Sequence, residues 1–338
     1  MIISRTPFRV SFFGGGTDYP EWYKKYGGEV VAASIDKYCY ITCRHLPPFF
    51  DHKFRIVYSK IELAKEIDEI QHPVVKEVLK YLSIDGGLDI HYDGDIPARS
   101  GIGSSSSFTV GLLNAITSFN NLNLSKYQLS TKSIYIEREL TMDCVGCQDQ
   151  ITAAFGGLNH IVFTKNGEFI VNPVSLSESR ICDFENHLML FFTGFSRLSS
   201  EQAKKIIENI SEKHMALSKI RQFVGEALSI INSKTDLKFI GELLHESWMY
   251  KRSLSNVMSN VLIDEIYTEA RLAGALGGKI IGAGGGGFLL LFVRPRDRLA
   301  VKNRLKNLIH VPFRFDLEGS QILYCDQKAK RYNNDGEN

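Results

Sequence analysis

Apolar residues follow two different periods along this chain, and these periods predict its elements. Residues 2–13 and 29–43 alternate apolar and polar positions and are rich in Val, Ile, Tyr and Phe, as β-strands are. Residues 73–82 instead place their apolar side chains at helical spacing. The first half of the chain also contains predicted strands at 54–58, 88–92 and 158–163, and predicted helices at about 104–120 and 126–139.

The second half of the chain mixes the same two kinds of element. It contains predicted strands at 187–192, 278–281, 288–293 and 321–325, and predicted helices at about 199–231, 236–255 and 264–275. Helices between flanking strands indicate an α+β domain, with the helices on one face of a mostly antiparallel sheet. Turn-rich segments at 166–167 and 175–179 suggest a boundary between 170 and 185. We therefore expect one domain over 1–175, a second over 176–326, and a polar tail at 327–338.

Composition narrows the class of protein. With 338 residues, 44% hydrophobic and 23% charged, the chain is typical of a globular protein with room for two domains. The net charge of +2, without any long basic run, argues against a nucleic-acid partner. No apolar segment approaches the ~18 residues of a membrane span, and the N-terminus lacks the pattern of a signal peptide. We therefore expect no membrane partner and a cytoplasmic location.

Six cysteines are too few for a disulfide scaffold in a chain of this length. Cys144 and Cys147 form a CxxC pair, but a zinc site needs a second pair of ligands and the sequence offers none. Ordinary thiols therefore explain these residues better than metal or redox chemistry. Cys39 and Cys43 lie four positions apart in a predicted strand, which places them on one face of a sheet, in the core.

The most informative segment is the glycine- and serine-rich run from Pro97 to Ser107, between a predicted strand and an apolar helix. Gly101 and Gly103 permit a tight turn, and four serines open the helix. The backbone N–H groups and the dipole at such a helix start favour an anion, and a nucleotide phosphate fits best. A flexible linker is the alternative, but a linker is not expected between a strand and a helix.

A second glycine-rich segment, residues 282–287, precedes the strand predicted at 288–293. It matches the letters of the dinucleotide-binding pattern, but that pattern must be followed by a helix. The chain also lacks the P-loop pattern and the protein-kinase motifs. Glycines let a backbone approach another group closely, so Gly284 and Gly285 are candidates for lining a substrate or phosphate pocket. A plain hairpin turn is the alternative.

The first predicted strand ends in a third glycine-rich turn, at residues 14–18. Gly15 and Gly16 would allow a ligand to approach, and Thr17 and Asp18 offer a hydroxyl and a carboxylate that suit sugar hydroxyls. A surface turn explains the same residues.

Two carboxylates, Glu137 and Asp149, complete the set of candidates. One could hold Mg²⁺ while the other orients or deprotonates an attacking hydroxyl. Their spacing alone favours a solvated charge pair, and only the motifs taken together favour catalysis.

Taken together, these motifs resemble those of the GHMP kinases, the superfamily of galactokinase, homoserine kinase, mevalonate kinase and phosphomevalonate kinase. Residues 6–10 with 16–18 resemble the first motif, residues 97–105 match the second throughout, and residues 282–287 resemble the third. The resemblance covers nearly the whole chain. It implies an α+β, two-domain fold, with an N-terminal ribosomal-protein-S5-like domain and a C-terminal ferredoxin-like domain. Within the superfamily, residues 14–18, 148–157, 193–197 and 245–255 are similar to those of heptose 7-phosphate kinases.

The resemblance implies a sugar kinase that uses ATP and Mg²⁺, and it assigns roles to single residues. Asp149 would take or orient the proton of the sugar hydroxyl, with Arg9 beside it to favour the developing alkoxide. Ser105 and Glu137 would hold Mg²⁺. The ATP phosphates would lie against Pro97, Gly101, Gly103, Ser104, Ser105 and Ser106. Twelve positions separate Glu137 from Asp149, one more than in the mevalonate-type enzymes, so Glu139 is kept as an alternative ligand.

The expected acceptor is the anomeric hydroxyl of D-glycero-D-manno-heptose 7-phosphate, and the expected product is the 1,7-bisphosphate. A distal phosphate requires cations at the far end of the pocket, and the candidates are Arg197, Lys251 and Arg252. Solvated positions on long helices would explain these three residues equally well. The alternatives are another sugar 1-kinase, of the fucokinase or galactokinase type, and a nucleotide-binding regulator without activity. A homodimer is compatible with the sequence.

Overall fold

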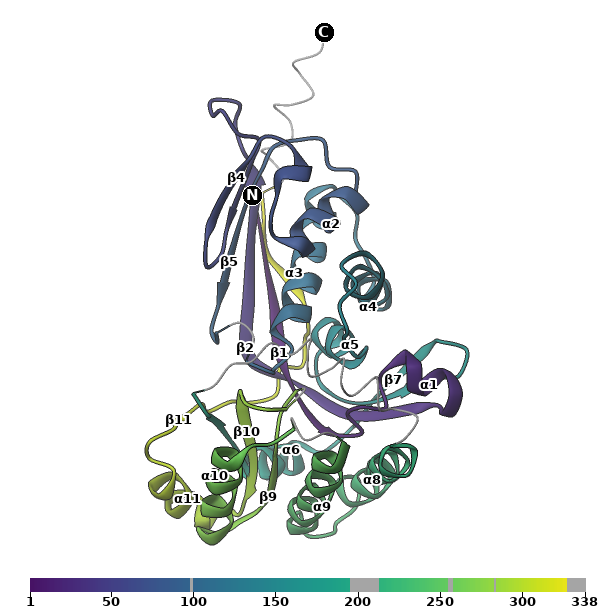
Figure 1. The fold of residues 1–338 in the computed structure, drawn as a ribbon, viewed down its shortest axis with the longest axis vertical. Coiled ribbons are helices and arrows are strands. Elements are labelled where there is room, and N and C mark those ends of the chain that lie inside the picture. Colours follow the sequence, from purple (N-terminus) through teal and green to yellow (C-terminus); the bar gives the residue numbers. More distant parts are fainter. Residues whose placement is uncertain (98–99, 195–212, 255–257, 283, 327–338) are drawn as a thin grey trace.

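The computed structural model describes residues 1–97, 100–194, 213–254, 258–282 and 284–326, and it contains two mixed layers of helix and sheet (Figure 1). The larger sheet has eight strands and is antiparallel except where β3 pairs with β5. Its members are β1 (Ile2–Phe13), β2 (Gly28–His45), β3 (Phe54–Val57), β4 (Ile61–Ala64), β5 (Leu88–Gly94), β6 (Leu158–Phe163), β7 (Phe169–Pro173) and β12 (Gln321–Cys325).

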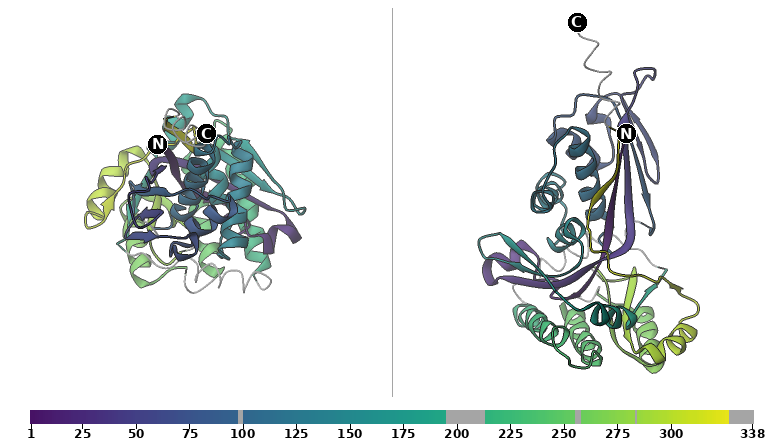
Figure 2. Two further views of the ribbon diagram at one scale, coloured as in Figure 1. Left: turned by 90° about the horizontal axis from the view of Figure 1, so that it is seen from above. Right: turned by 180° about the vertical axis from the view of Figure 1, so that it is seen from behind.

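Helices gather on one face of this sheet, as both side views show (Figures 1 and 2). They are α2 (Pro73–Tyr81), α3 (Ser104–Phe119), α4 (Lys126–Tyr135) and α5 (Gln148–Phe155), with short α1 (Pro20–Tyr26) at the far end of β1 and β2 and a 3-10 turn η1 (Ile67–Glu69). Helix α3 is the central one, and 13 of its 16 residues are buried, including three of its four opening serines. Burial on almost every side fits its position between the sheet and the outer helices.

The smaller sheet has four antiparallel strands in the order β11-β8-β10-β9. Its members are β8 (Leu188–Phe192), β9 (Ala275–Ile280), β10 (Phe288–Val293) and β11 (Ile309–His310). The helices of this layer are α6 (Glu178–Asn186), α8 (His214–Ile231), α9 (Lys238–Leu254), α10 (Val261–Leu272) and α11 (Arg298–Arg304), with a 3-10 turn η3 (Pro295–Asp297). No helix in the described ranges is long and apolar enough to cross a membrane.

Strand β1 carries two irregularities that matter for the site. Its pairing with β2 shifts between Pro7 and Phe8 and again between Ser11 and Phe13. Bulges increase the local twist and re-aim side chains, and they are common beside active sites. Arg9 and Ser11 therefore lie in a short segment whose side chains are directed by a bulge on each side.

The α+β class and the predicted strands and helices of the first half are confirmed within a few residues, and both Cys39 and Cys43 are fully buried. Three boundaries differ. The helix predicted to Glu139 ends as an α-helix at Tyr135 and continues as a π-helical turn, η2 (Ile136–Leu140). The helix predicted to residue 275 ends earlier, because Gly274 has a φ of +110° and stops it, and β9 begins at Ala275. The helix predicted at 199–231 lies partly outside the described residues and is seen from His214.

The end of the chain returns to the larger sheet. Strand β12 pairs with β1, with Ile2 opposite Cys325. The span predicted for a second domain, 176–326, therefore contains a strand of the first sheet. The division near residue 175 remains a prediction, and the polar tail at 327–338 lies outside the described residues.

One hydrophobic core joins the two layers. Its buried members include Phe8 and Phe12 of β1 together with Phe184 of α6 and Phe292 of β10. The ring of Phe184 lies 5.4 Å from that of Phe12 and 5.8 Å from that of Phe292. The segment of β1 that carries Arg9 is thus fixed against both layers.

Candidate active site

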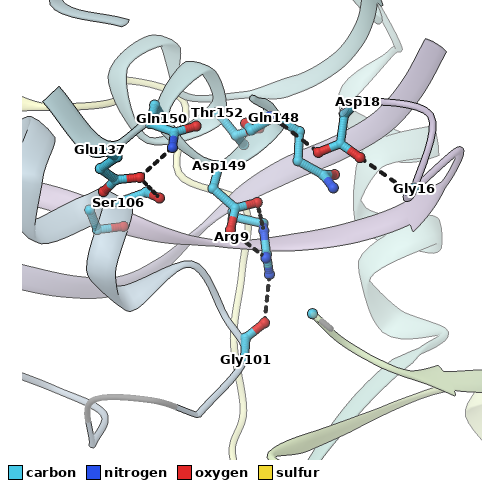
Figure 3. A network of polar contacts seen from close by, with 12 residues as sticks. Arg9, Gly16, Asp18, Gly101, Ser106, Glu137, Gln148, Asp149, Gln150 and Thr152 are labelled. Carbon is cyan, nitrogen blue, oxygen red and sulfur yellow. Dashed lines mark hydrogen bonds and ion pairs between the residues drawn. The ribbon is translucent and has the colours of Figure 1, made fainter. Parts of the chain in front are cut away.

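Arg9 and Asp149 form the centre of the site (Figure 3). Arg9 donates from Nε and Nη2 to the two carboxylate oxygens of Asp149, each over 2.7 Å. Its Nη1 donates to the carbonyl of Gly101 over 2.8 Å. The Arg9 side chain is buried, whereas that of Asp149 is 22% exposed. A forked pair fixes the plane of a carboxylate, and one that stays accessible can receive or orient the proton of a bound hydroxyl.

Asp18 belongs to the turn between β1 and α1. Its carboxylate is buried against the first residue of α5, close to Asp149. Its carboxylate accepts hydrogen bonds from the backbone N–H groups of Gly16 (2.9 Å) and Gln148 (3.4 Å). Gly146 packs against it so closely that a β-carbon there would come within 2.0 Å of Oδ2. Burial raises the pKa of Asp18, and the negative charge of Asp149 acts in the same direction. The structure thus holds the carboxyl group in a fixed orientation beside Asp149.

The other predicted residues of this turn, Gly15, Gly16 and Thr17, make different contacts. Thr17 donates its hydroxyl to the carbonyls of Gly14 and Glu29, each at 2.9 Å, and is fully buried. The Thr17 hydroxyl, predicted to suit a sugar hydroxyl, is thus already bonded to the turn and to β2. Gly16 supports Asp18 through its N–H group, and Gly15 lies beside the side chains of Ser11 and Gln148.

Residues 100–103, which we name the phosphate loop after their predicted ligand, lead into α3 in the manner predicted. Gly101 and Gly103 have φ values of +86° and +74°, which glycine adopts without steric cost. Gly103 caps α3 without any side chain, and the first turn of this 16-residue helix contains no acidic residue. The positive end of the helix is therefore suited to phosphate. The carbonyl of Pro97 accepts a hydrogen bond from Ser100 over 2.8 Å and closes the loop.

Glu137 is completely buried behind this helix and receives three side-chain hydrogen bonds. The donors are Ser106 Oγ at 2.8 Å, Thr109 Oγ1 at 2.6 Å and the amide of Gln150. Burial raises the pKa of Glu137 to about 7 in spite of these donors. A carboxylate with hydroxyl groups beside it is a suitable oxygen donor set for Mg²⁺, which needs only one or two carboxylates when phosphates supply further ligands.

Ser105 and Glu137 stay the predicted metal ligands, and the structure adds Ser106 as a neighbour of Glu137. Glu137 is hydrogen-bonded to Ser106, which is buried beside Ser104, whereas Ser105 is exposed. Glu139, the alternative ligand, is also exposed. Glu137 lies on the π-helical turn η2, and a π-turn contains one residue more than an α-turn. The π-turn thus lies within the longer spacing between Glu137 and Asp149, and the charge of Asp149 still acts on Glu137.

The glycine loop 282–287 approaches the phosphate loop rather than an open pocket. A β-carbon on Gly282 would lie 2.6 Å from the carbonyl oxygen of Gly101, and one on Gly287 would lie 2.2 Å from that of Ser100. The close backbone approach predicted from the glycines is therefore confirmed, and the partner is the phosphate loop. This contact joins the two layers directly at the site.

Gly284 and Gly285, predicted to line a substrate pocket, lie against Met258 in the structure. A β-carbon on Gly284 would lie 2.8 Å from Met258 Sδ, and the Gly285 N–H donates to the Met258 carbonyl over 3.0 Å. These two glycines make room for Met258, which is fully buried.

Lys251 and Arg252 are neighbours on α9 but face different surroundings. Lys251 is buried and donates to the carbonyl of Gly282 over 2.6 Å. Burial lowers its pKa to about 8, and the charges of Arg9, Asp18 and Asp149 all act on it. Arg252, also predicted to bind the substrate, pairs instead with Asp264 over 2.7 Å in the structure. Consecutive residues of a helix point about 100° apart, which is why only one of them can face the site. Arg197 lies outside the described residues.

Lys279 is a charged group that the sequence analysis did not single out. It lies in β9, is 3% exposed, and donates to the carbonyl of Phe12 over 2.9 Å. Burial lowers its pKa strongly, and the positive charges of Lys251 and Arg9 add to this effect. A single lysine in an otherwise apolar strand is the signal that could have found it. Thr109 and Gln150, which hold Glu137, carry no comparable signal.

Comparison with known proteins connects these features to a family. Residues 68–157 match the family model of the GHMP kinases N terminal domain, and residues 229–310 match that of the GHMP kinases C terminal domain. A D-glycero-alpha-D-manno-heptose 7-phosphate kinase of Campylobacter jejuni is 32% identical over 316 residues, which cover 88% of this chain and 91% of the relative.

Two solved structures show the same fold. The crystal structure of a D-glycero-D-manno-heptose 1-phosphate kinase from Bacteroides thetaiotaomicron has a TM-score of 0.78 and 27% identity, and it covers 97% of this chain and 100% of that chain. The structure of Lactococcus lactis galactokinase with galactose has a TM-score of 0.71 at 21% identity, with 96% and 95% covered.

Proposed function

The chain belongs to the GHMP kinase family, and on that premise we propose that it phosphorylates the anomeric hydroxyl of a heptose 7-phosphate. Its relatives make it a sugar kinase with ATP as the phosphate donor. The observation that carries the proposal is the arrangement of Arg9, which holds the Asp149 carboxylate and the Gly101 carbonyl with one guanidinium. Arg9 thereby holds the Asp149 carboxylate, which would receive the proton, in a fixed position relative to the phosphate loop.

In the proposed reaction, the anomeric oxygen of the sugar attacks the γ-phosphorus of ATP, and the bond from that phosphorus to the β,γ-bridging oxygen breaks. Asp149 orients the attacking hydroxyl and receives its proton. Arg9 and the N-terminus of α3 stabilise the negative charge on the oxygens around the transferred group. Phosphoryl transfer depends mainly on such positioning and charge stabilisation. The products are ADP and the heptose 1,7-bisphosphate.

Glu137 would hold Mg²⁺ together with the hydroxyls of Ser106 and Thr109. The ion, when bound, would neutralise charge on the β- and γ-phosphates. A carboxyl group whose pKa is raised to about 7 by burial ionises readily when a cation is near. The network around Glu137 is therefore suited to exchanging a proton for a metal ion.

Lys251 is kept as the candidate ligand of a phosphate on the acceptor. It is the one predicted cation that the described structure brings near Arg9, Asp18 and Asp149. The Campylobacter relative is named a heptose 7-phosphate kinase and the Bacteroides structure a heptose 1-phosphate kinase. The alternative acceptor is therefore a differently phosphorylated heptose, or an unphosphorylated sugar as in galactokinase.

The test is ADP release from ATP and Mg²⁺ against a panel of acceptors. The panel contains heptose 7-phosphate, heptose 1-phosphate, the free heptose, fucose, galactose and a blank without sugar. We expect turnover with heptose 7-phosphate, and loss of turnover in Asp149→Asn with ATP binding intact. Turnover confined to another acceptor would replace the proposed substrate, and near-normal turnover in Asp149→Asn would remove Asp149 from its role.

A further inference from the structure

Two buried polar side chains beside the reaction centre lack a hydrogen-bond partner in the described part of the chain. They are Ser11, through Oγ, and Gln148, through Oε1; a third unpartnered atom, Gln150 Oε1, belongs to the separate network around Glu137. Ser11 is 4% exposed and Gln148 is 8% exposed. Buried polar groups are nearly always hydrogen-bonded, so an unpartnered pair at one place indicates a missing ligand.

The two side chains border one recess. A β-carbon on Gly15 would lie 3.6 Å from Ser11 Oγ and 3.7 Å from Gln148 Nε2, and Gly15 does not need glycine for its backbone conformation. The missing side chain of Gly15 therefore leaves space that Ser11 and Gln148 both face. Ser11 comes from the bulged segment of β1, and Gln148 from the first turn of α5.

The recess lies beside both carboxylates of the site. Gln148 directly precedes Asp149, and its N–H group donates to Asp18. Its side chain extends between the carboxylates of Asp149 and Asp18 (Figure 3). A ligand held by this amide would therefore also lie against the group that receives the proton.

The chemistry of the recess identifies the class of ligand. A hydroxyl and a primary amide can each donate and accept, which suits the vicinal hydroxyls of a sugar. The neighbouring carboxylates would repel a phosphate at this position. We propose that Ser11 and Gln148 bind ring hydroxyls of the acceptor sugar, and that Gln148 determines which sugar places its anomeric oxygen at Asp149.

This inference rests on the proposed function only in requiring a sugar acceptor, so it is tested with whichever acceptor of the panel is turned over. Gln148→Met and Ser11→Ala are compared with Gln222→Met, which changes an exposed glutamine of α8. We expect the KM for the sugar to rise about tenfold in the first two variants, since each loses a buried hydrogen bond to substrate. The KM for ATP should stay within about twofold of the wild-type value in all three variants.

Deoxy analogues of the acceptor give the sharper readout. In the wild-type protein, removal of the hydroxyl that Gln148 binds should raise the KM about tenfold, and Gln148→Met should no longer distinguish that analogue from the parent sugar. An unchanged sugar KM in both variants overturns the inference. So does a rise in the KM for ATP of equal size, or equal discrimination of every analogue by wild type and Gln148→Met. Thermal melting of each variant reveals any loss of folding, in which case Ser11→Cys and Gln148→Glu replace the first pair.

Discussion

Arg9 is the residue whose geometry is most demanding, because three of its nitrogens bind two different partners. A lysine has one nitrogen and cannot fork around Asp149 while reaching the carbonyl of Gly101. We expect Arg9→Lys to lower kcat by at least about 100-fold, the usual effect of removing one preorganised donor at a reacting centre. Steady-state kinetics with saturating ATP measure this effect. Arg252→Lys is the matched control, since Arg252 pairs with Asp264 away from Asp149, and a similar loss in the control would contradict the prediction.

Lys251 gives the site a pH dependence of its own. Burial lowers its pKa to about 8, so its positive charge is present below that pH and is lost above it. If Lys251 binds the distal phosphate, kcat/KM for heptose 7-phosphate should fall as the pH rises from 7 to 9. Lys251→Arg keeps its charge throughout and should not show this fall. Equal profiles for the two proteins would exclude Lys251 as the phosphate ligand.

The lowered pKa of Lys251 also changes the free energy of unfolding with pH. The direction is opposite to that expected for a lysine paired with a carboxylate, whose pKa is raised. The pKa of Lys251 is lower in the folded state than its ordinary value of 10.5, so folding favours the neutral amine. The stabilisation is present above pH 10.5 and is lost as the pH falls through 8, which leaves a cost of about 3 kcal/mol near pH 7. Lys251→Met should therefore melt at a higher temperature than wild type at pH 7, and the gap should narrow at pH 9.5. Calorimetric melting at both values checks this.

The residues that sequence could identify are those whose role depends on local backbone. Gly101 and Gly103 precede a helix, and that context alone predicts a phosphate loop. Thr17, Gly284 and Arg252 have contacts that depend on residues elsewhere in the chain. Their partners are Glu29, Met258 and Asp264, respectively. No pattern in the sequence predicts which partner such a side chain meets.

At the scale of elements, the contact between the glycine loop and the phosphate loop explains why both loops are rich in glycine. Gly282→Ala would place a β-carbon 2.6 Å from the Gly101 carbonyl at a residue with a φ of +79°. The phosphate loop would have to move, so we expect the KM for ATP to rise about tenfold or more, by analogy with small displacements at other sites. Gly225→Ala is the control, because Gly225 lies in α8 with no atom within 4 Å of its β-position. Kinetics that stay unchanged in Gly282→Ala would show that the two loops do not depend on one another.

The π-helical turn η2 shows what spacing can and cannot indicate. The sequence reveals that Glu137 and Asp149 are one residue further apart than the resemblance leads us to expect. It cannot tell whether the extra residue lies in a loop or within a helix. The structure has a π-turn at Glu137 itself, a rare element that often occurs at functional sites. Register along a helix is thus decided by packing, here by the hydroxyls of Ser106 and Thr109 around the carboxylate.

At the scale of the whole molecule, the chain crosses between its two layers more often than a division at one boundary suggests. Strand β12 returns to β1 after the smaller sheet is complete. Phe184 packs on Phe12 of one layer and Phe292 of the other. Local periodicity predicted β12 correctly as a strand, but strand pairing is a non-local property that a periodic pattern does not contain.

This shared core predicts that the two layers unfold together. The chain has two tryptophans, and both are almost fully buried: Trp22 in α1 beside the larger sheet and Trp248 in α9 beside the smaller one. Trp248→Phe leaves Trp22 as the only reporter, and Trp22→Phe leaves Trp248. We expect the fluorescence midpoint of each variant in urea to coincide with its own midpoint by circular dichroism, as in a two-state transition. Each substitution can itself change the stability of the protein, so the two midpoints are compared within each variant. A reporter that unfolds ahead of the backbone signal would show that its layer is an independent unit, and the core around Phe12, Phe184 and Phe292 would then be a docking surface rather than a common interior.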